Sequence, residues 1–272
     1  MIMRHVAVCG DFDDLRSRQM RFLQEAAKFG AVYVRLWSDQ LCRILKNHAP
    51  KFTQQERLYF VRALRYVRKA TVTDGPGDCD SLPALKPPPD IWVVDQAGDN
   101  TARRKFSRIH GLDYQVITDE QLRGFPWPAP EDGSRVRSKV IVTGCYDWLH
   151  TGHIRFFEEA AKYGELYVVV GHDRNIQQLK GLGHPLLPQE ERGYLVQSIR
   201  HVRRTLISSG AGWLDAEPEI KQIQPDIYIV NEDGDQPSKR DYCRQNGIRY
   251  LVLRRRPRPG LPRRRSTALR GF

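Results

Sequence analysis

Two histidines, His150 and His153, lie close together in the sequence with Gly152 between them, directly after an apolar run that begins at Val140. Imidazoles donate hydrogen bonds to phosphate oxygens. A helix start adds unpaired backbone N–H groups and the positive end of the helix dipole, and a glycine there lets a phosphate approach the backbone. This triplet therefore predicts a phosphate-binding site.

The elements around the triplet have the pattern that such a site needs. Residues 140–142 are β-branched and predict a buried strand, and Gly144 marks a turn. Apolar residues then recur at helical spacing from Ile154 to Ala161. A strand that feeds a helix through a tight turn places both histidines on the first turn of that helix.

The stretch from Gly144 to His153, GCYDWLHTGH, resembles the HxGH signature of the cytidylyltransferase-like nucleotidyltransferases. The resemblance implies that His150 and His153 are catalytic and stabilise the α-phosphate of a nucleoside triphosphate. It assigns to the nucleotide Thr143, Gly144, Cys145, Tyr146 and Gly152, and to the acceptor substrate Asp147. The alternative for the histidines is a surface pair or an opportunistic zinc pair on one helix face.

The chain contains an internal repeat. Residues 10–30 align with residues 144–164 at a constant offset of 134 positions, and the match continues to 89–91 and 225–227 with a drift of two residues. Each copy has strands alternating with helices, the first at 32–36 and 91–94, the second at 166–170 and 227–230. This order predicts an α/β fold of two tandem Rossmann-like domains, each a parallel sheet flanked by helices.

We expect a first domain at residues 1–123, a linker rich in proline and glycine at 124–137, and a catalytic domain at 138–272. The first domain has Arg16, Arg18 and Gln19 in place of the two histidines and the glycine. It is therefore predicted to be catalytically silent, with a regulatory anion site at the arginines as the alternative. The tandem arrangement resembles that of ethanolamine-phosphate cytidylyltransferases and implies either a monomeric pseudo-dimer or a homodimer.

The same resemblance extends to three further positions of the second copy. Lys180 lies in a polar stretch where the family has a lysine that contacts the nucleotide or the incoming phosphate, and we count it as both catalytic and substrate-binding. Arg192 is expected to face the acceptor phosphate, and Trp213 to border the acceptor. For each of them a purely structural role is the alternative.

Two later stretches are assigned to the nucleotide. Asn231 and Asp233 follow a buried strand, where an acidic or amide group can meet ribose, base or metal. The end of the chain resembles the family's RTxGxST motif with a longer spacing, so Ser266 and Thr267 are expected to cap the last helix. Several arginines compete for the motif position: Arg254 and Arg255 are favoured, with Arg265 as a competitor.

The composition of the 272 residues agrees with a soluble cytoplasmic enzyme. No apolar run is long enough to span a membrane, and the first ten residues are too few for a signal peptide. Five scattered cysteines give neither a disulfide framework nor a zinc site. The net charge of +12 predicts an anionic partner. Mg²⁺ is expected with a triphosphate, without a dedicated protein cage for the metal.

The sequence thus predicts a nucleotidyltransferase that moves CMP from CTP to a small phosphorylated or phosphonate metabolite and releases pyrophosphate. An adenylyltransferase that uses ATP is the first alternative, because enzymes of both kinds share the histidines. The second is a non-catalytic regulator that binds phosphate or nucleic acid through the arginines between Arg254 and Arg265. Nucleic acid is the less favoured partner, because binding it does not require the histidine pair.

Overall fold

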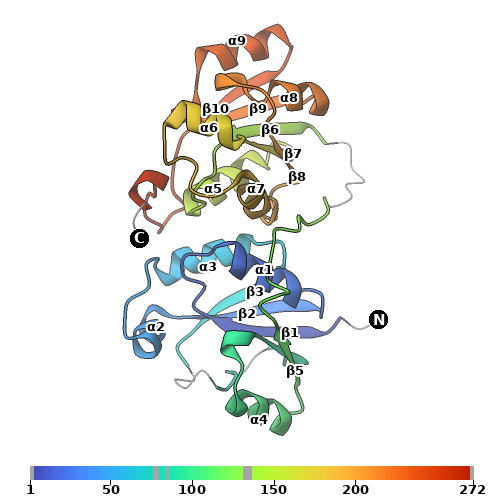
Figure 1. Ribbon diagram of the computed structural model, residues 1–272, viewed down its shortest axis with the longest axis vertical. Coiled ribbons are helices and arrows are strands. Elements are labelled where there is room, and N and C mark those ends of the chain that lie inside the picture. The colour runs from blue at the N-terminus through green and yellow to red at the C-terminus, as the bar shows by residue number, and fades with distance from the viewer. Residues whose placement is uncertain (1–2, 76–79, 84–85, 131–136, 270–272) are drawn as a thin grey trace. The chain divides into compact units, whose positions relative to one another are not determined.

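Each half of the chain forms a five-stranded parallel sheet with helices on its two faces (Figure 1). The computed structural model describes residues 3–75, 80–83, 86–130 and 137–269. Within it the chain divides into two units, Met1–Phe125 and Pro126–Phe272. The α/β fold with two Rossmann-like units that the repeat predicts is confirmed.

The described parts of the two units share one order of strands and main helices, to which the second unit adds η2, α8 and η4. The first is built from β1 (His5–Gly10), α1 (Ser17–Ala26), β2 (Ala31–Trp37), α2 (Asp39–Lys46), α3 (Gln54–Ala63), β3 (Val67–Thr73), β4 (Ile91–Asp95), the 3₁₀ turn η1 (Gln96–Gly98), α4 (Thr101–Ile109) and β5 (Asp113–Ile117). The second is built from β6 (Lys139–Gly144), α5 (Thr151–Ala160), β7 (Glu165–Val170), α6 (Asp173–Lys180), α7 (Gln189–Gln197), β8 (Arg204–Ile207), η2 (Gly212–Leu214), α8 (Glu217–Ile223), β9 (Ile227–Asn231), η3 (Glu232–Gly234), α9 (Pro237–Gln245), β10 (Arg249–Leu253) and η4 (Ser266–Leu269).

The strand order fixes where a ligand can enter. The sheets are ordered β3-β2-β1-β4-β5 and β10-β9-β6-β7-β8, with all neighbouring strands parallel. In the second unit the chain runs outward from β6 through β7 to β8 and then returns to the other side of β6 as β9 and β10. Neighbouring connections therefore diverge between β6 and β9, which opens a crevice at the carboxyl ends of these strands.

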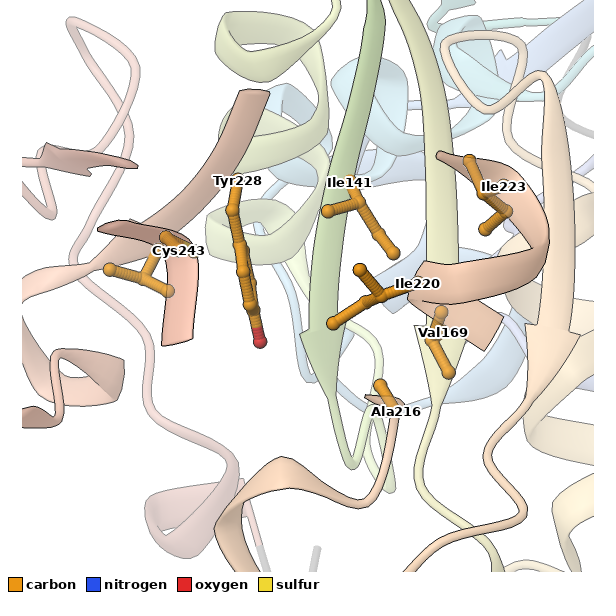
Figure 2. Close-up of a cluster of buried hydrophobic side chains, with 8 residues drawn as sticks. Ile141, Val169, Ala216, Ile220, Ile223, Tyr228 and Cys243 are labelled. Atoms are coloured by element: carbon orange, nitrogen blue, oxygen red, sulfur yellow. The ribbon is translucent and has the colours of Figure 1, made fainter. Parts of the chain in front are cut away.

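The β-branched strands of the second unit are buried because helices cover both of their faces. Figure 2 shows one of these contacts, in which Ile220 of α8 points toward Ile141 of β6 and Val169 of β7. Tyr228 of β9 and Cys243 of α9 belong to the same apolar cluster. This packing fixes the central strands, and with them the turns at their carboxyl ends.

The segment expected as a linker belongs in part to the second unit. The Trp127 indole N–H donates to the carbonyl of Glu190, and its ring occupies the space beside Gly193 of α7. Residues 131–136 lie outside the described part of the chain.

Candidate functional site

The turn between β6 and α5 places His150 at the N-cap of the helix. Its backbone is extended, and its Nδ1 atom accepts a hydrogen bond from the Gly152 N–H at 3.0 Å. The proton of the neutral ring is thereby assigned to Nε2. The ring is 2% exposed, and Nε2 has no hydrogen-bond partner among the described residues.

His153 lies one turn further along α5, and its ring stacks on that of His150 with centroids 4.0 Å apart. Burial lowers the pKa of His150 to about 3, with smaller contributions from Arg255 and Arg264. Burial also lowers the pKa of His153 well below its usual range, helped by His150. Both imidazoles are therefore neutral at pH 7, and each keeps one buried ring nitrogen unpaired within the described structure.

Tyr146 supports this pair from the turn. Its φ of 52° is in the left-handed region, and its ring packs edge-on against His153 with centroids 5.5 Å apart. A Cβ on Gly144 would lie only 2.8 Å from the tyrosine ring. The glycine is therefore required for the aromatic ring to lie beneath His153.

A cavity of about 700 Å³ opens above this turn, in the crevice between β6 and β9. Its wall brings together most of the residues that the sequence assigned to the site: Thr143, Gly144, Cys145, Tyr146, Asp147, Gly152, His153, Lys180, Asn231, Asp233, Arg255 and Ser266. His150 lies behind His153 rather than in the wall. Arg265, the competitor for the motif position, also lies in the wall. Residues that the sequence did not assign to the site line the cavity as well: Trp148, Phe156, His184, Leu186, Glu232 and Arg263. Only the basic or aromatic character of Trp148, His184 and Arg263 near the motifs could have indicated them.

Of the arginines near the end of the chain, some line the cavity and others line a smaller pocket beside it. Arg255 lies in the cavity wall, forms an ion pair with Asp233, and donates to the carbonyl of Arg264 at 3.2 Å. Arg254 lines a smaller adjoining pocket, which also contains Gly152 and Arg255, and is not among the described residues of the larger cavity wall. The geometry therefore favours Arg255 over Arg254 as the cation nearest the start of α5.

Ser266 begins the short turn η4, and its hydroxyl donates to the carbonyl of Trp148 at 3.4 Å instead of capping a helix. The side chain of Thr267 lies outside the described residues. Lys180 is the last residue of α6 rather than part of a loop. The helix forms because His172 caps its start, accepting from the Asn175 N–H, and it ends at Gly181, whose φ is 87°.

Arg192 differs from the expectation that it faces the acceptor. Its side chain is 0% exposed, and its guanidinium donates to the carbonyls of Leu187 and Cys145 and to the Asp173 carboxylate. It is absent from the described cavity wall. A buried arginine with these three acceptors has a structural role, because it ties α6 and α7 to the turn after β6.

Asp147 reaches the cavity wall but also acts as a structural anchor. One carboxylate oxygen accepts from the backbone N–H groups of Leu186 and Leu187, at 2.7 and 3.0 Å. In the first unit the Asp13 carboxylate likewise accepts from two consecutive N–H groups, those of Lys51 and Phe52, with one oxygen for each. The shared arrangement indicates that this carboxylate shapes the loop.

Trp213 also differs from expectation. It lies on η2, after the edge strand β8, and is 54% exposed. The described residues of the cavity wall do not include it. β8 is two strands away from β6 in the sheet. A side chain that follows β8 is therefore distant from the crevice between β6 and β9.

The corresponding turn of the first unit is filled by internal contacts. The Gln19 side chain accepts from the Arg16 N–H at 3.1 Å, and Arg18 pairs with Asp119 at 2.6 Å. The cations that could have formed a regulatory anion site there are engaged with carboxylates. Arg16 likewise contacts Asp14.

Across the described ranges, no cluster of three or more histidine, cysteine, aspartate or glutamate side chains is arranged to hold a metal. Asp233, the acidic side chain expected to meet ribose, base or metal, pairs with Arg255. None of the described helices is long and apolar enough to span a membrane.

The fold and the site define a Rossmann-like nucleotidyltransferase unit. Comparison with known proteins agrees: the sequence model of the cytidylyltransferase-like family matches residues 141–256. The FAD synthase of Methanohalophilus mahii is 32% identical over 120 residues, which is 43% of this chain and 80% of that enzyme. The FAD synthase of Thermococcus kodakarensis is 34% identical over 123 residues, 44% of this chain and 80% of that enzyme. The chain belongs to the cytidylyltransferase-like family of nucleotidyltransferases.

Among solved structures, the lipopolysaccharide core biosynthesis protein from Thermoplasma volcanium GSS1 matches 44% of this chain and 98% of that chain, at 25% identity and a TM-score of 0.38.

Proposed function

We propose that the second unit transfers AMP from ATP to the phosphate of a small metabolite and releases pyrophosphate. The observation that carries the proposal is the buried, neutral pair His150 and His153 at the start of α5, with unpaired ring nitrogens beside a cavity lined by Lys180, Arg255, Arg263 and Arg265. ATP is preferred over CTP because the FAD synthase relatives make a product in which AMP is joined to a flavin phosphate.

The chemistry needs charge stabilisation and positioning more than proton transfer. An oxygen of the acceptor phosphate attacks the α-phosphorus, a new P–O bond forms, and the bond to the β-phosphate breaks as pyrophosphate leaves. The acceptor oxygen is already anionic, so no general base is required. Negative charge that gathers on the α-phosphate is met by imidazole N–H donors at the start of α5, where the Gly152 N–H is already bonded to Nδ1 of His150.

Cations of the cavity wall have separate tasks in this scheme. Arg255, Arg263 and Arg265 lie on the side of the chain end and suit the departing pyrophosphate. Lys180 approaches from α6 and suits the acceptor phosphate or the α-phosphate. Mg²⁺ bound to the triphosphate would neutralise part of the charge on its oxygens.

Thermal unfolding with Mg²⁺ and each of ATP, CTP, GTP and UTP tests the nucleotide. A ligand at a hundred times its dissociation constant adds about 2.7 kcal/mol to the free energy of unfolding. We expect ATP to raise the midpoint of the wild type and to lose this effect in His150→Ala/His153→Ala. A shift with CTP alone would restore the cytidylyl alternative, and no shift with any nucleotide would overturn the proposal.

The acceptor is then identified by pyrophosphate release in the presence of ATP and a panel of phosphate esters. In FMN, phosphoethanolamine and glycerol 3-phosphate the group that carries the phosphate is aromatic, cationic and neutral polar, respectively. Release that needs both ATP and one of these acceptors supports the transfer. Release without any acceptor would instead indicate hydrolysis.

A further inference from the structure

The two lysines that end α2 and α6 occupy equivalent positions but have different partners. In the first unit the Lys46 ammonium forms an ion pair with the carboxylate of Asp11. In the second unit the equivalent of Asp11, at the offset of 134 residues, is Cys145. Within the described ranges the Lys180 ammonium has no ion-pair partner, and it lies in the cavity wall together with Cys145.

The backbone around these two positions is held in the same way. Arg57 donates to the carbonyl of Asp11 at 2.5 Å and to the carboxylate of Asp39 at 2.8 Å. Arg192 donates to the carbonyl of Cys145 at 2.6 Å and to the carboxylate of Asp173 at 2.6 Å. The two turns therefore present the side chain of residue 11 or 145 to the lysine from the same scaffold. The difference between the units lies in the side chain itself.

We propose that Cys145 is a positioning residue whose neutral side chain leaves Lys180 unpaired, so that its charge is available to a phosphate in the cavity. An aspartate at this position would capture the ammonium, as Asp11 captures Lys46. The inference rests on the proposed function for the identity of the phosphate ligand. The difference between Lys46, which has an ion-pair partner, and Lys180 does not depend on that function.

The Cys145 thiol is suited to this task. Burial raises the pKa of the Cys145 thiol above its usual value, although the nearby Lys180 and Arg192 act in the opposite direction. The sulfur is thus uncharged at pH 7 and cannot form an ion pair with the lysine. A thiol is also a weak hydrogen-bond acceptor, so it does not hold an ammonium group in place.

A second pair of positions also carries a carboxylate in the first unit alone. In the first unit Arg18 pairs with Asp119, which comes two residues after β5. The equivalent positions of the second unit carry Gly152 and Arg255, which comes two residues after β10. The first unit has a carboxylate at both places and the second unit has none at the equivalent positions, where Arg255 pairs instead with Asp233 of η3.

Trace acetylation of the intact protein, with peptides resolved by mass spectrometry, tests the pairing without nucleotide. A neighbouring carboxylate stabilises the ammonium form, so a paired lysine reacts more slowly. We expect Asp11→Cys to raise the reactivity of Lys46 about two- to fivefold, the range given by a partly exposed ion pair. Cys145→Asp should lower the reactivity of Lys180 by a similar factor, and Cys145→Asn should not. Unchanged reactivity of both lysines would overturn the inference.

Calorimetric titration with Mg²⁺-ATP tests the consequence. Cys145→Asp is expected to weaken binding about 10- to 100-fold, because a charge-assisted contact to phosphate is lost. Cys145→Asn adds the same bulk without the charge and should weaken binding at least tenfold less. Equal losses in the two variants would show a steric effect and contradict the inference.

The two experiments separate the two proposals. Absence of ATP binding in the wild type would count against the proposed function, while the acetylation of Lys46 and Lys180 would still decide the pairing. Should Cys145→Asp fail to fold, the reactivity of Lys46 in Asp11→Cys still decides whether an aspartate at this position holds the lysine.

Discussion

The backbone N–H of Gly152 donates to Nδ1 of His150, and this bond fixes the chemistry of the buried imidazole. The acceptor nitrogen cannot carry a proton while it caps α5, so the remaining proton is on Nε2. Burial, which lowers the pKa of His150 to about 3, acts in the same direction. The ring is a permanent neutral donor that needs no titration to serve an anionic ligand.

Removal of His153 should affect turnover far more than the equivalent change in the first unit. His153→Ala is expected to lower kcat about 10²–10³-fold, as for other lost donors to transition-state charge. Gln19→Ala removes only a contact to the Arg16 backbone and should leave kcat unchanged. Steady-state release of pyrophosphate measures both. Comparable losses would mean that the first unit takes part in catalysis.

Gly152 is expected to tolerate no side chain. A Cβ there would lie 2.8 Å from the His150 ring and would face the phosphate approach to the backbone. Gly152→Ala should therefore lower kcat/KM for ATP about tenfold or more. The matched change in the first unit, Arg18→Ala, breaks an exposed ion pair and should have no effect on activity. Full activity of Gly152→Ala would exclude the turn as the phosphate site.

The buried histidines make the protein sensitive to acid. The pKa of His150 is about 3 in the folded chain and about 6.5 when unfolded, so the unfolded state binds more protons between these values. The free energy of unfolding should fall as pH drops below about 6.5, by about 1.4 kcal/mol per pH unit for each such group. His150→Asn keeps a cap acceptor and should show a shallower fall. Urea unfolding at pH 7, 6, 5 and 4 gives both slopes, and identical slopes would contradict the prediction.

Arg192 and Arg57 should behave alike because they make the same three kinds of contact. Replacement of either by methionine leaves two backbone carbonyls and a partly exposed carboxylate without their partner, at a cost of about 2–3 kcal/mol. Chemical denaturation of Arg192→Met and Arg57→Met should show this loss in both. An Arg192→Met protein of full stability that no longer binds an acceptor would restore a substrate-binding role.

Local patterns were sufficient for the fold and for the turn that carries the two histidines. The strand at 140–142, the turn and the helix from Thr151 depend on residues close together in the chain, and so does the spacing of His150 and His153. The repeat added the architecture, because two similar segments have similar local preferences. These features are short-range, and the physics that determines them is contained in a window of a few residues.

The tertiary structure decided which of the remaining side chains face the cavity. Arg192 has the sequence pattern of a substrate contact but is buried against carbonyls 5 and 47 positions away. Trp213 falls outside the described wall because β8 is at the edge of the sheet, and Arg255 enters the wall because β10 and β9 bring it beside Asp233. Whether Lys180 has an ion-pair partner depends on Cys145, the residue that follows β6. The sequence by itself thus determined the turn and its chemistry, whereas burial, strand order and long-range ion pairs, which no local window contains, decided the rest of the site.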